Sequence, residues 1–277
     1  MKAVLTRARS VWWLARGGAR RSDGEGVRIL FYHRVSDDHD VLAVTPKRFA
    51  EQMAFVADAG LSGVDVAEVS RRLRSGEGRG GVVGLSFDDG YLDVAERAAP
   101  VLAEHGFAAS VFIATAVTEG RASFTWYERQ PPLIPWDRIV ELDRSGPLRF
   151  EAHTRTHPNL LRVDDATAHT EIAGGKADLE RRLGRAVAGF CYPAGLFGPR
   201  ERRLVAEAGF RFAVSCEPGV NTSATDPLAL HRIQVDAHDS LLDFRAKLLG
   251  GHDAPPPLRS AYRRRRYATP VRASSRS

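Results

Sequence analysis

Two adjacent carboxylates, Asp88 and Asp89, follow an apolar run and precede a glycine. The run, residues 82–85, predicts a buried strand, and Gly90 allows a sharp turn into a helix predicted over residues 91–104. Neighbouring carboxylates repel each other unless a cation or a proton separates them. The pair therefore suits a division of labour in which one carboxylate binds a metal and the other acts as a base. The alternative is a solvated turn whose acids cap the helix.

Two imidazoles, His153 and His157, lie four residues apart after a strand predicted over residues 148–152. In a helical turn, both rings would face one side and could share a metal ion. One carboxylate and two imidazoles make the ligand set of a hydrolytic metal site that keeps one position open for water. The remaining carboxylate would then act as general base for that water.

Strands and helices alternate along the chain around these residues. Seven strands are predicted, over residues 27–32, 82–88, 108–113, 148–152, 187–192, 210–215 and 228–235. This alternation favours a parallel sheet. Polar side chains fall at the C-terminal ends of four of the strands, namely His33, Asp88, Asp89, His153 and Tyr192. In a β/α barrel, the C-terminal ends of the strands carry the active site. An open doubly wound sheet is the alternative, although no glycine-rich phosphate loop follows the first strand.

The composition indicates one large domain with basic ends. The 277 residues are 43% hydrophobic, and two cysteines exclude a disulfide framework. The formal net charge is +6, but residues 255–277 carry seven arginines and no acids, and residues 1–26 carry six basic and two acidic residues, which leaves −5 for residues 27–254. We expect an N-terminal segment and linker over 1–26, a barrel over 27–254 and a disordered tail over 255–277.

The first 21 residues predict a basic amphipathic helix. Leu5, Ala8 and Trp12 share one face, and basic residues lie beside it. This pattern is typical of a helix on a membrane surface, and a frayed terminus is the alternative. The apolar centre, residues 11–15, is too short for a signal peptide, and no run approaches the ~20 residues that span a bilayer. We therefore expect a cytoplasmic or peripheral membrane protein. No nucleic-acid partner is expected, because the main body is acidic.

A long irregular connection is expected over residues 114–134. It contains Trp126 and Tyr127 together with prolines. Long loops in compact domains are often functional, so we expect this one to contribute to the site.

Four motifs in order make the assignment specific: FYHRV at 31–35, LSFDDGY at 85–91, AHTRTHPNL at 152–160 and FCYPAG at 190–195. Over roughly residues 28–250 the chain resembles the polysaccharide deacetylases, the NodB-homology family that forms carbohydrate esterase family four. The first motif is similar to the opening strand of a subgroup that acts on bacterial exopolysaccharides. The resemblance implies a single-domain deformed (β/α)₇ barrel.

The resemblance also implies a role for each ligand-type residue. Asp89, His153 and His157 would bind a divalent metal, usually zinc in the family, and Asp88 would be the general base. The implied enzyme is a hydrolase of carbon–nitrogen bonds other than peptide bonds, with a metal-bound water as nucleophile. It would remove N-acetyl groups from an N-acetylated polysaccharide or oligosaccharide, and release acetate and a free amine.

The last motif departs from the family pattern. By resemblance, Tyr192, Pro193 and Gly195 contact the substrate, and the Tyr192 backbone N–H stabilises the oxyanion. Many relatives carry an arginine where this chain has Cys191, and that arginine holds the catalytic carboxylate. The later aspartate–tryptophan motif is not recognisable in residues 211–226.

We predict that Arg232 replaces the missing arginine. A buried carboxylate base needs a cation or donors to stay ionised at neutral pH. Strand alternation points His231 and Arg232 to opposite faces, so an inward Arg232 could reach Asp88 from the other side of the barrel. The alternative is a surface Arg232 with His231 facing the metal. The general acid is therefore either His33 or His231.

Other functions remain open on the same residues. The site could serve an O-acetyl esterase or a hydrolase of small cyclic amides, and the fold could be a catalytically silent glycan-binding barrel. The complete set of two carboxylates and two imidazoles argues against the silent barrel, because a silent relative should lose one of them.

Overall fold

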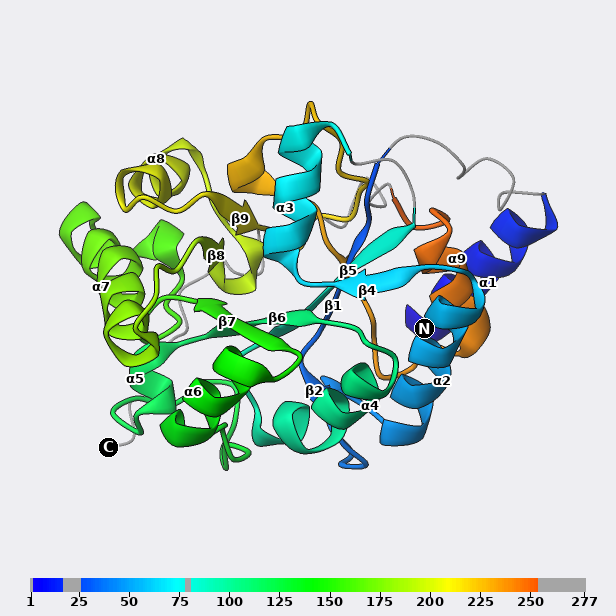
Figure 1. Ribbon diagram of the computed structural model, residues 1–277, viewed down its shortest axis with the longest axis horizontal. Coiled ribbons are helices and arrows are strands. Elements are labelled where there is room, and N and C mark those ends of the chain that lie inside the picture. Colours follow the sequence, from blue (N-terminus) through cyan, green and yellow to red (C-terminus); the bar gives the residue numbers. More distant parts are fainter. Residues whose placement is uncertain (1, 17–25, 78–80, 254–277) are drawn as a thin grey trace, which may run out of the picture.

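The computed structural model describes residues 2–16, 26–77 and 81–253. A single curled sheet of parallel strands, surrounded by helices, forms the body of the molecule (Figure 1). Its seven main strands are β1 (Ile29–Tyr32), β5 (Val82–Asp88), β6 (Ala109–Ile113), β7 (Leu148–Ala152), β8 (Gly189–Cys191), β9 (Phe212–Val214) and β10 (Ile233–Gln234).

The strand order is β10-β1-β5-β6-β7-β8-β9, and β4 (Ser62–Val64) pairs with the start of β5. The two edges of the sheet meet where Leu230 forms a parallel bridge to Val214 of β9. The predicted deformed β/α barrel in one domain is therefore confirmed. A separate two-stranded sheet joins β2 (Arg34–Val35) to β3 (Ala43–Val44).

Helices connect most of the strands, and their starts follow ordinary capping chemistry. The Thr45 side chain accepts the Arg48 N–H ahead of a first-turn proline, and Ser240 and Asp243 form a capping box. The α-helices are α1 (Lys2–Ala15), α2 (Pro46–Asp58), α3 (Val66–Ser75), α4 (Ala99–Glu104), α5 (Thr115–Thr118), α6 (Trp136–Ser145), α7 (Asp165–Leu183), α8 (Pro199–Glu207) and α9 (Leu241–Leu248). A π-helical turn, η2 (Val94–Ala98), precedes α4, and three short 3₁₀ turns are η3 (Leu160–Arg162), η4 (Pro193–Gly195) and η5 (Pro227–Ala229).

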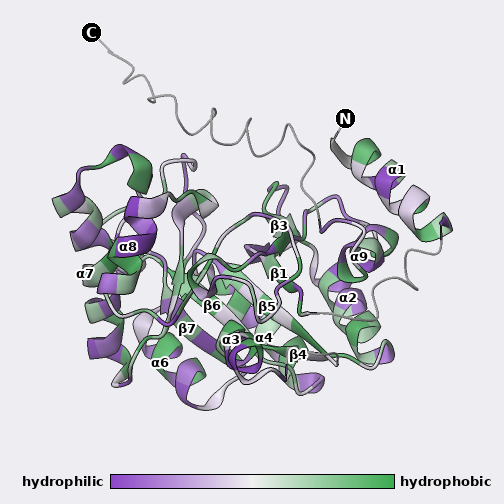
Figure 2. Cartoon of the chain, turned by 90° about the horizontal axis from the view of Figure 1, so that it is seen from above, coloured by the Kyte–Doolittle hydropathy of each residue, from purple (hydrophilic) through white to green (hydrophobic). Residues whose placement is uncertain are grey.

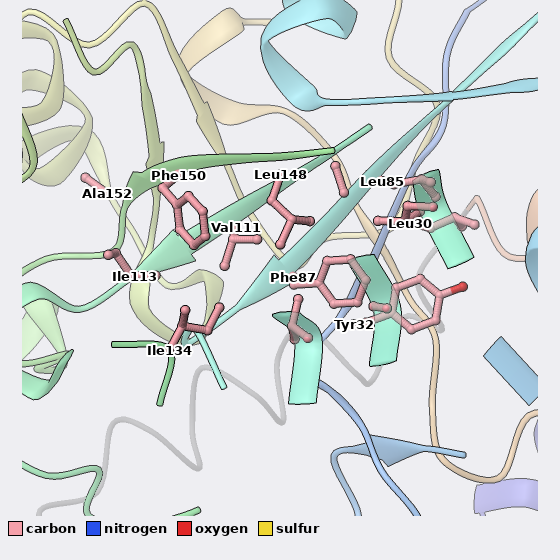
Figure 3. Close-up of a cluster of buried hydrophobic side chains, with 14 of the residues drawn as sticks. Leu30, Tyr32, Leu85, Phe87, Val111, Ile113, Ile134, Leu148, Phe150 and Ala152 are labelled. Carbon is pink, nitrogen blue, oxygen red and sulfur yellow. The ribbon is translucent and has the colours of Figure 1, made fainter. Parts of the chain in front are cut away.

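Alternation along the strands separates an apolar face from a polar one. Leu85 and Phe87 of β5 join a buried cluster between the sheet and its surrounding helices (Figure 3). Ser86 and Asp88, the residues between and after them, point to the other face of the sheet. A second cluster on that inner face brings in α3 and ends close to Asp88, with Phe112 and Cys191 among its members. The barrel interior is thus apolar at one end and carries the polar residues at the other.

The helix predicted over residues 91–104 is confirmed from Leu92 onward, and it contains a π-helical stretch. Its start also bonds to residues 132–134, because Ile134 donates its N–H to the Gly90 carbonyl and Leu92 donates to the Pro132 carbonyl. The π-helical turn follows, in which the Ala99 N–H bonds to the Val94 carbonyl. Pro100 has no N–H to donate to residue 96, and regular α-helix resumes at Ala99.

The last strand is shorter than the predicted 228–235. Residues 231 and 232 take their backbone partners from the segment after β9, since His231 donates its N–H to the Asn221 side chain and Arg232 donates to the Glu217 carbonyl. Only Ile233 and Gln234 then pair with β1.

The N-terminal helix α1 is present and lies beside α9 at one edge of the molecule (Figures 1 and 2). Within residues 2–16, 26–77 and 81–253, no helix combines the length and the apolar character needed to cross a membrane. The predicted linker and basic tail fall on residues 22–26 and 255–277, which lie outside the described residues apart from Gly26.

Candidate active site

Three ligand-type side chains converge at the C-terminal end of the sheet. The Nε2 atoms of His153 and His157 lie 3.7 and 4.0 Å from the same oxygen, Asp89 Oδ1. One ligand atom from each residue lies within 4.8 Å of the others, which is compatible with a single cation between them. The structure therefore brings together the three residues expected to bind a metal.

The environment of these atoms fits a cation. Asp89 Oδ1 is buried and has no hydrogen-bond partner in the described part of the chain, while Oδ2 accepts from the Tyr91 hydroxyl at 3.2 Å. Burial, and after it the charge of Asp88, raises the pKa of Asp89. Because a buried carboxylate without a partner is costly, a cation in front of Oδ1 would stabilise its ionised form.

The imidazoles are prepared as neutral ligands. His153 Nδ1 lies 2.7 Å from the Cys191 carbonyl oxygen, a contact that places the proton on Nδ1 and the lone pair on Nε2. Burial lowers the pKa of His153 to about 4 and holds the pKa of His157 well below its usual range. Neutral imidazole with a free Nε2 lone pair is the form that binds divalent zinc.

The two histidines do not lie on a helical turn, so that interpretation of their spacing is wrong. Thr154 and His157 have φ angles of 67° and 58°, and Asp89 has 74°, all in the left-handed region. The Thr154 hydroxyl accepts the His157 N–H at 2.9 Å and stabilises this conformation. Left-handed residues other than glycine cost about 1–2 kcal/mol each and cluster at functional sites.

Helix α7 supports this irregular turn through residues that sequence reasoning missed. The Glu171 carboxylate accepts the backbone N–H groups of Arg155 and Thr156, both at 2.8 Å. A Cβ atom at Gly175 would lie 2.9 Å from the Thr154 carbonyl oxygen, so only glycine lets the helix approach this closely. The glycine pair in the middle of a predicted helix was the available signal, because glycine there needs a packing reason.

Asp88, at the end of β5, pairs with Arg232, which lies just before β10, and only β1 separates these two strands in the sheet. Arg232 Nη1 lies 2.6 Å from Oδ1 and Nη2 lies 2.8 Å from Oδ2, which makes a bidentate contact. The guanidinium is fully buried, with Nε bonded to the Ser215 carbonyl at 2.8 Å. It lies 4.3 Å from the centre of the Phe31 ring. Arg232 thus occupies the inward orientation and contacts the carboxylate that needs a countercharge.

This contact controls the charge of Asp88. Burial alone would raise the pKa of the Asp88 carboxyl, but the charge of Arg232 and its two hydrogen bonds outweigh burial and lower it to about 2. Cys191 lies beside the pair, with Sγ 3.1 Å from Arg232 Nη2 and 3.7 Å from Asp88 Oδ2. The thiol fills the place beside Asp88 without supplying a charge, since burial raises the pKa of Cys191.

The two candidate acids have different settings. His33 follows β1 and is partly buried, and its pKa is lowered by burial and raised in part by the charge of Asp88. The His231 ring packs against Gly219, where a Cβ atom would lie 2.7 Å from the ring carbon Cγ. His231 and Arg232 therefore point to opposite faces, and of the two candidate acids His33 is the one whose pKa is affected by the charge of Asp88.

The Tyr192 N–H, which the family resemblance places at the oxyanion, has a partner within the sheet. It donates to the Val214 carbonyl at 3.2 Å as part of the β8–β9 pairing, and the Tyr192 hydroxyl donates to the Leu228 carbonyl. Pro193 has no N–H, and the Gly195 N–H donates back to the Tyr192 carbonyl. Ala194, with a left-handed φ of 53°, carries the one N–H of this segment that these hydrogen bonds do not engage.

Aromatic side chains of the long loop border the ligand cluster. The Trp126 ring lies 4.9 Å from the His157 ring and stacks on Phe124 at 4.6 Å. Trp126 keeps 44% of its surface exposed, whereas Phe124 is buried. The Tyr127 hydroxyl donates to Asp40, which also accepts from Arg34, so the loop is tied to the segment after β2.

Comparison with known proteins agrees with this geometry. The family model described as polysaccharide deacetylase matches residues 75–213. YxkH of Bacillus subtilis (strain 168), a protein assigned to the polysaccharide deacetylases, is 26% identical over 208 residues, which are 75% of this chain and 70% of that protein. The poly-β-1,6-N-acetyl-D-glucosamine N-deacetylase of Staphylococcus aureus (strain MRSA252) is 21% identical over 223 residues, 77% of this chain and 75% of that enzyme.

The fold has solved counterparts. The deacetylase PplD of Streptococcus pyogenes, solved in complex with acetate, aligns with a TM-score of 0.71 at 23% identity, and the alignment covers 84% of this chain and 100% of that one. The segment matched by the family model contains both carboxylates and both imidazoles, while His33 and Arg232 lie outside it. The chain belongs to the polysaccharide deacetylase family, and its relatives indicate a polysaccharide deacetylase, a hydrolase acting on carbon–nitrogen bonds other than peptide bonds.

Proposed function

We propose that this protein removes N-acetyl groups from an N-acetylated glycan, and that the reaction depends on a divalent cation, zinc, held by Asp89, His153 and His157. The observation that carries the proposal is the buried Asp89 Oδ1 facing two imidazole Nε2 atoms, next to an Asp88 that stays ionised. The relative from Staphylococcus aureus, a poly-β-1,6-N-acetyl-D-glucosamine N-deacetylase, supports a glycan of the exopolysaccharide class.

Asp88 is the base in this proposal. Its carboxylate is charged at neutral pH because Arg232 offsets the cost of burial. A carboxylate with so low a pKa is a weak base, so it suits a water that is already acidified. When bound, the cation would act as a Lewis acid that lowers the pKa of water toward neutrality and polarises the acetamide carbonyl.

His33 is the proposed general acid, and the Ala194 N–H is the proposed oxyanion donor. The departing amine needs a proton, and His33 is the imidazole outside the metal set that feels the charge of Asp88. A hydrogen bond from a backbone N–H to the developing oxyanion is strongest in the transition state. Such donors therefore accelerate acyl transfer. The left-handed Ala194 is the backbone group of the last motif that remains for this role.

The aromatic border supports an extended sugar substrate. The exposed face of Trp126 offers a flat apolar surface beside His157, and Phe124 holds the ring from behind. Sugar rings present apolar C–H faces that pack on such surfaces, as apolar ligands do in aromatic-lined pockets. A small cyclic amide bound at the cation would not need this platform.

Trp126→Ala should therefore weaken substrate binding more than turnover. We expect KM for an N-acetylglucosamine oligomer to rise about tenfold with kcat changed little, because the lost contact is equally present in ground and transition states. Steady-state kinetics on a short oligomer series would measure this. Leu161→Ala is the matched control, since Leu161 is also 44% exposed and should leave KM unchanged. Equal KM values for the two variants would show that Trp126 does not contribute to substrate binding.

Arg232→Met should lower kcat at least about tenfold and shift the acid limb of the pH–rate profile to higher pH. Arg232 depresses the pKa of Asp88, so without it burial dominates, the pKa rises and the base stays protonated up to a higher pH. The bound metal should remain. The variant also loses a buried partner, at a cost of about 3–5 kcal/mol, so folding is checked by circular dichroism.

Arg185→Met is the matched control for this prediction. Arg185 also makes a bidentate contact with a buried carboxylate, that of Asp143, through Nε at 2.7 Å and Nη2 at 2.6 Å, on another part of the barrel. It should lose stability but keep the pH profile of the wild type. If Arg232→Met keeps that profile as well, the role of Arg232 is structural only.

The proposed function is tested by incubating the zinc-loaded protein with N-acetylated oligosaccharides and with O-acetylated xylan. Mass spectrometry would show loss of acetyl groups, and an amine-reactive dye would show the new amino group. Amine release from the N-acetylated series supports the proposal. Acetyl loss from xylan alone would make the protein an O-acetyl esterase, and no loss from either substrate would favour a glycan-binding barrel.

A further inference from the structure

Helix α1 is docked onto the protein through a face that combines polar side chains with the partly buried Trp13 and Leu14. Ser10 is fully buried and lies 3.1 Å from His252 Nε2, and Arg9 Nε donates to the Gly251 carbonyl at 2.8 Å. Arg7 bonds to the buried Asp243 of α9, also at 2.8 Å. These contacts come from the middle of the helix and fix its rotation about its own axis.

The apolar face of α1 consequently points outward. Val4, Leu5, Val11 and Trp12 are 70%, 64%, 48% and 57% exposed. Their spacing, together with the exposed Ala8 and Ala15, makes one continuous stripe along the helix. A helix of a globular protein normally turns such a stripe toward the core, whereas this stripe faces outward. We call this stripe the α1 apolar face.

The charges around the stripe are all positive. Residues 1–21 contain no acidic side chain, and the Arg16 guanidinium lies 4.5 Å from the centre of the Trp12 ring. The last described residues, Gly251 and His252 among them, lie against α1, so the segment with seven arginines and no acids follows directly from this contact. The main body, in contrast, has a net charge of −5.

We propose that the α1 apolar face binds the surface of an anionic lipid bilayer. An apolar stripe with tryptophan and flanking arginines matches the boundary between acyl chains and headgroups, where the ring is buried and the cations meet phosphate. The acidic body is repelled by such a surface, and the basic α1 and tail are attracted to it, so charge sets the orientation. This surface is separate from the active site, and the proposal does not rest on the proposed function.

The test uses the full-length protein and sedimentation with vesicles of phosphatidylcholine alone or mixed with phosphatidylglycerol. The wild type should sediment with the mixed vesicles and less with phosphatidylcholine alone. Leu5→Glu and Trp12→Glu should each weaken binding to the mixed vesicles about tenfold or more, because each removes a large apolar group from the contact. Leu161→Glu, a matched change at an exposed leucine elsewhere, should bind like the wild type.

Fluorescence gives a second readout. Mixed vesicles should shift the tryptophan emission to the blue, and lipids brominated on the acyl chain should quench it. Trp12→Phe should lose this response while Trp126→Phe keeps it. The proposal is overturned if the wild type fails to bind, or if Leu5→Glu binds as well as Leu161→Glu, since binding would then rest on charge alone. The proposal is equally overturned if light scattering shows that the wild type is a dimer and that Leu5→Glu, but not Leu161→Glu, dissociates it. A second copy of the protein would then cover the α1 apolar face.

Discussion

Asp88→Asn should lower kcat by about 10²–10⁴-fold while the cation stays bound. The substitution keeps the shape of the side chain but removes its charge. Asp88 is not one of the three residues proposed to hold the cation, although it lies within reach of a second group of ligand-type atoms with His153 and Cys191. Its contact with Arg232 changes as well, because an amide offers only one acceptor oxygen to a guanidinium that now makes two charge-assisted bonds. The measurement is kcat together with metal content of the dialysed protein.

Asp143→Asn is the control for this result. Asp143 is also buried and also bound in bidentate fashion, by Arg185, so the variant should show a similar loss of stability. Its kcat should remain near that of the wild type, because the pair lies away from the ligand cluster. Loss of bound metal in Asp88→Asn would show that the two neighbouring aspartates share the cation and that their roles are not divided as proposed.

His153→Ala should remove the cation and the activity together. The imidazole is one of three candidate ligands, and its orientation is fixed by the bond from Nδ1 to the Cys191 carbonyl. Without it, one carboxylate and one imidazole remain, which is below the three protein ligands typical of a catalytic zinc site. Zinc titration by calorimetry should show affinity falling by at least about 100-fold, and turnover should be lost in proportion.

His169→Ala provides the comparison, since His169 is exposed on α7 and has no place near the cluster. It should bind zinc and turn over like the wild type. Taken with Asp88→Asn, the result separates two functions of the site, because one variant keeps the metal and the other loses it. Full zinc affinity in His153→Ala would place the cation elsewhere and refute the ligand set.

Sequence reasoning reached the parts of the site that depend on periodicity. Strand alternation alone placed Arg232 and His231 on opposite faces, and the structure has the arginine on Asp88 and the histidine against Gly219. The parallel sheet followed from the order of strands and helices, and the deformed barrel was implied by the family resemblance. The strand ends bring together residues as distant as Asp88 and His157. These features could be predicted because they depend on the periodicity and the order of elements along the chain, and not on single tertiary contacts.

Features set by single tertiary contacts were not predictable. The histidine turn is left-handed at two residues because Glu171 and Gly175 of a later helix meet its backbone. The Tyr192 N–H is engaged because β9 pairs with β8 at that residue. Likewise, the irregular start of the helix after Gly90 depends on residues 132–134, some forty positions further along the chain. Local propensity holds no information about such partners.

The position of Arg232 beside the last strand has a consequence for how the chain folds. Asp88 and Arg232 are 144 residues apart, and their contact forms only when the segment leading into β10 joins β1 and β9. A folding intermediate that has assembled the sheet through β9 would hold Asp88 in an apolar interior without a countercharge, and it would therefore stay hydrated or protonated. Barrel closure and ionisation of the base are one event, so a chain that stops short of its final strand is both open and without a working base.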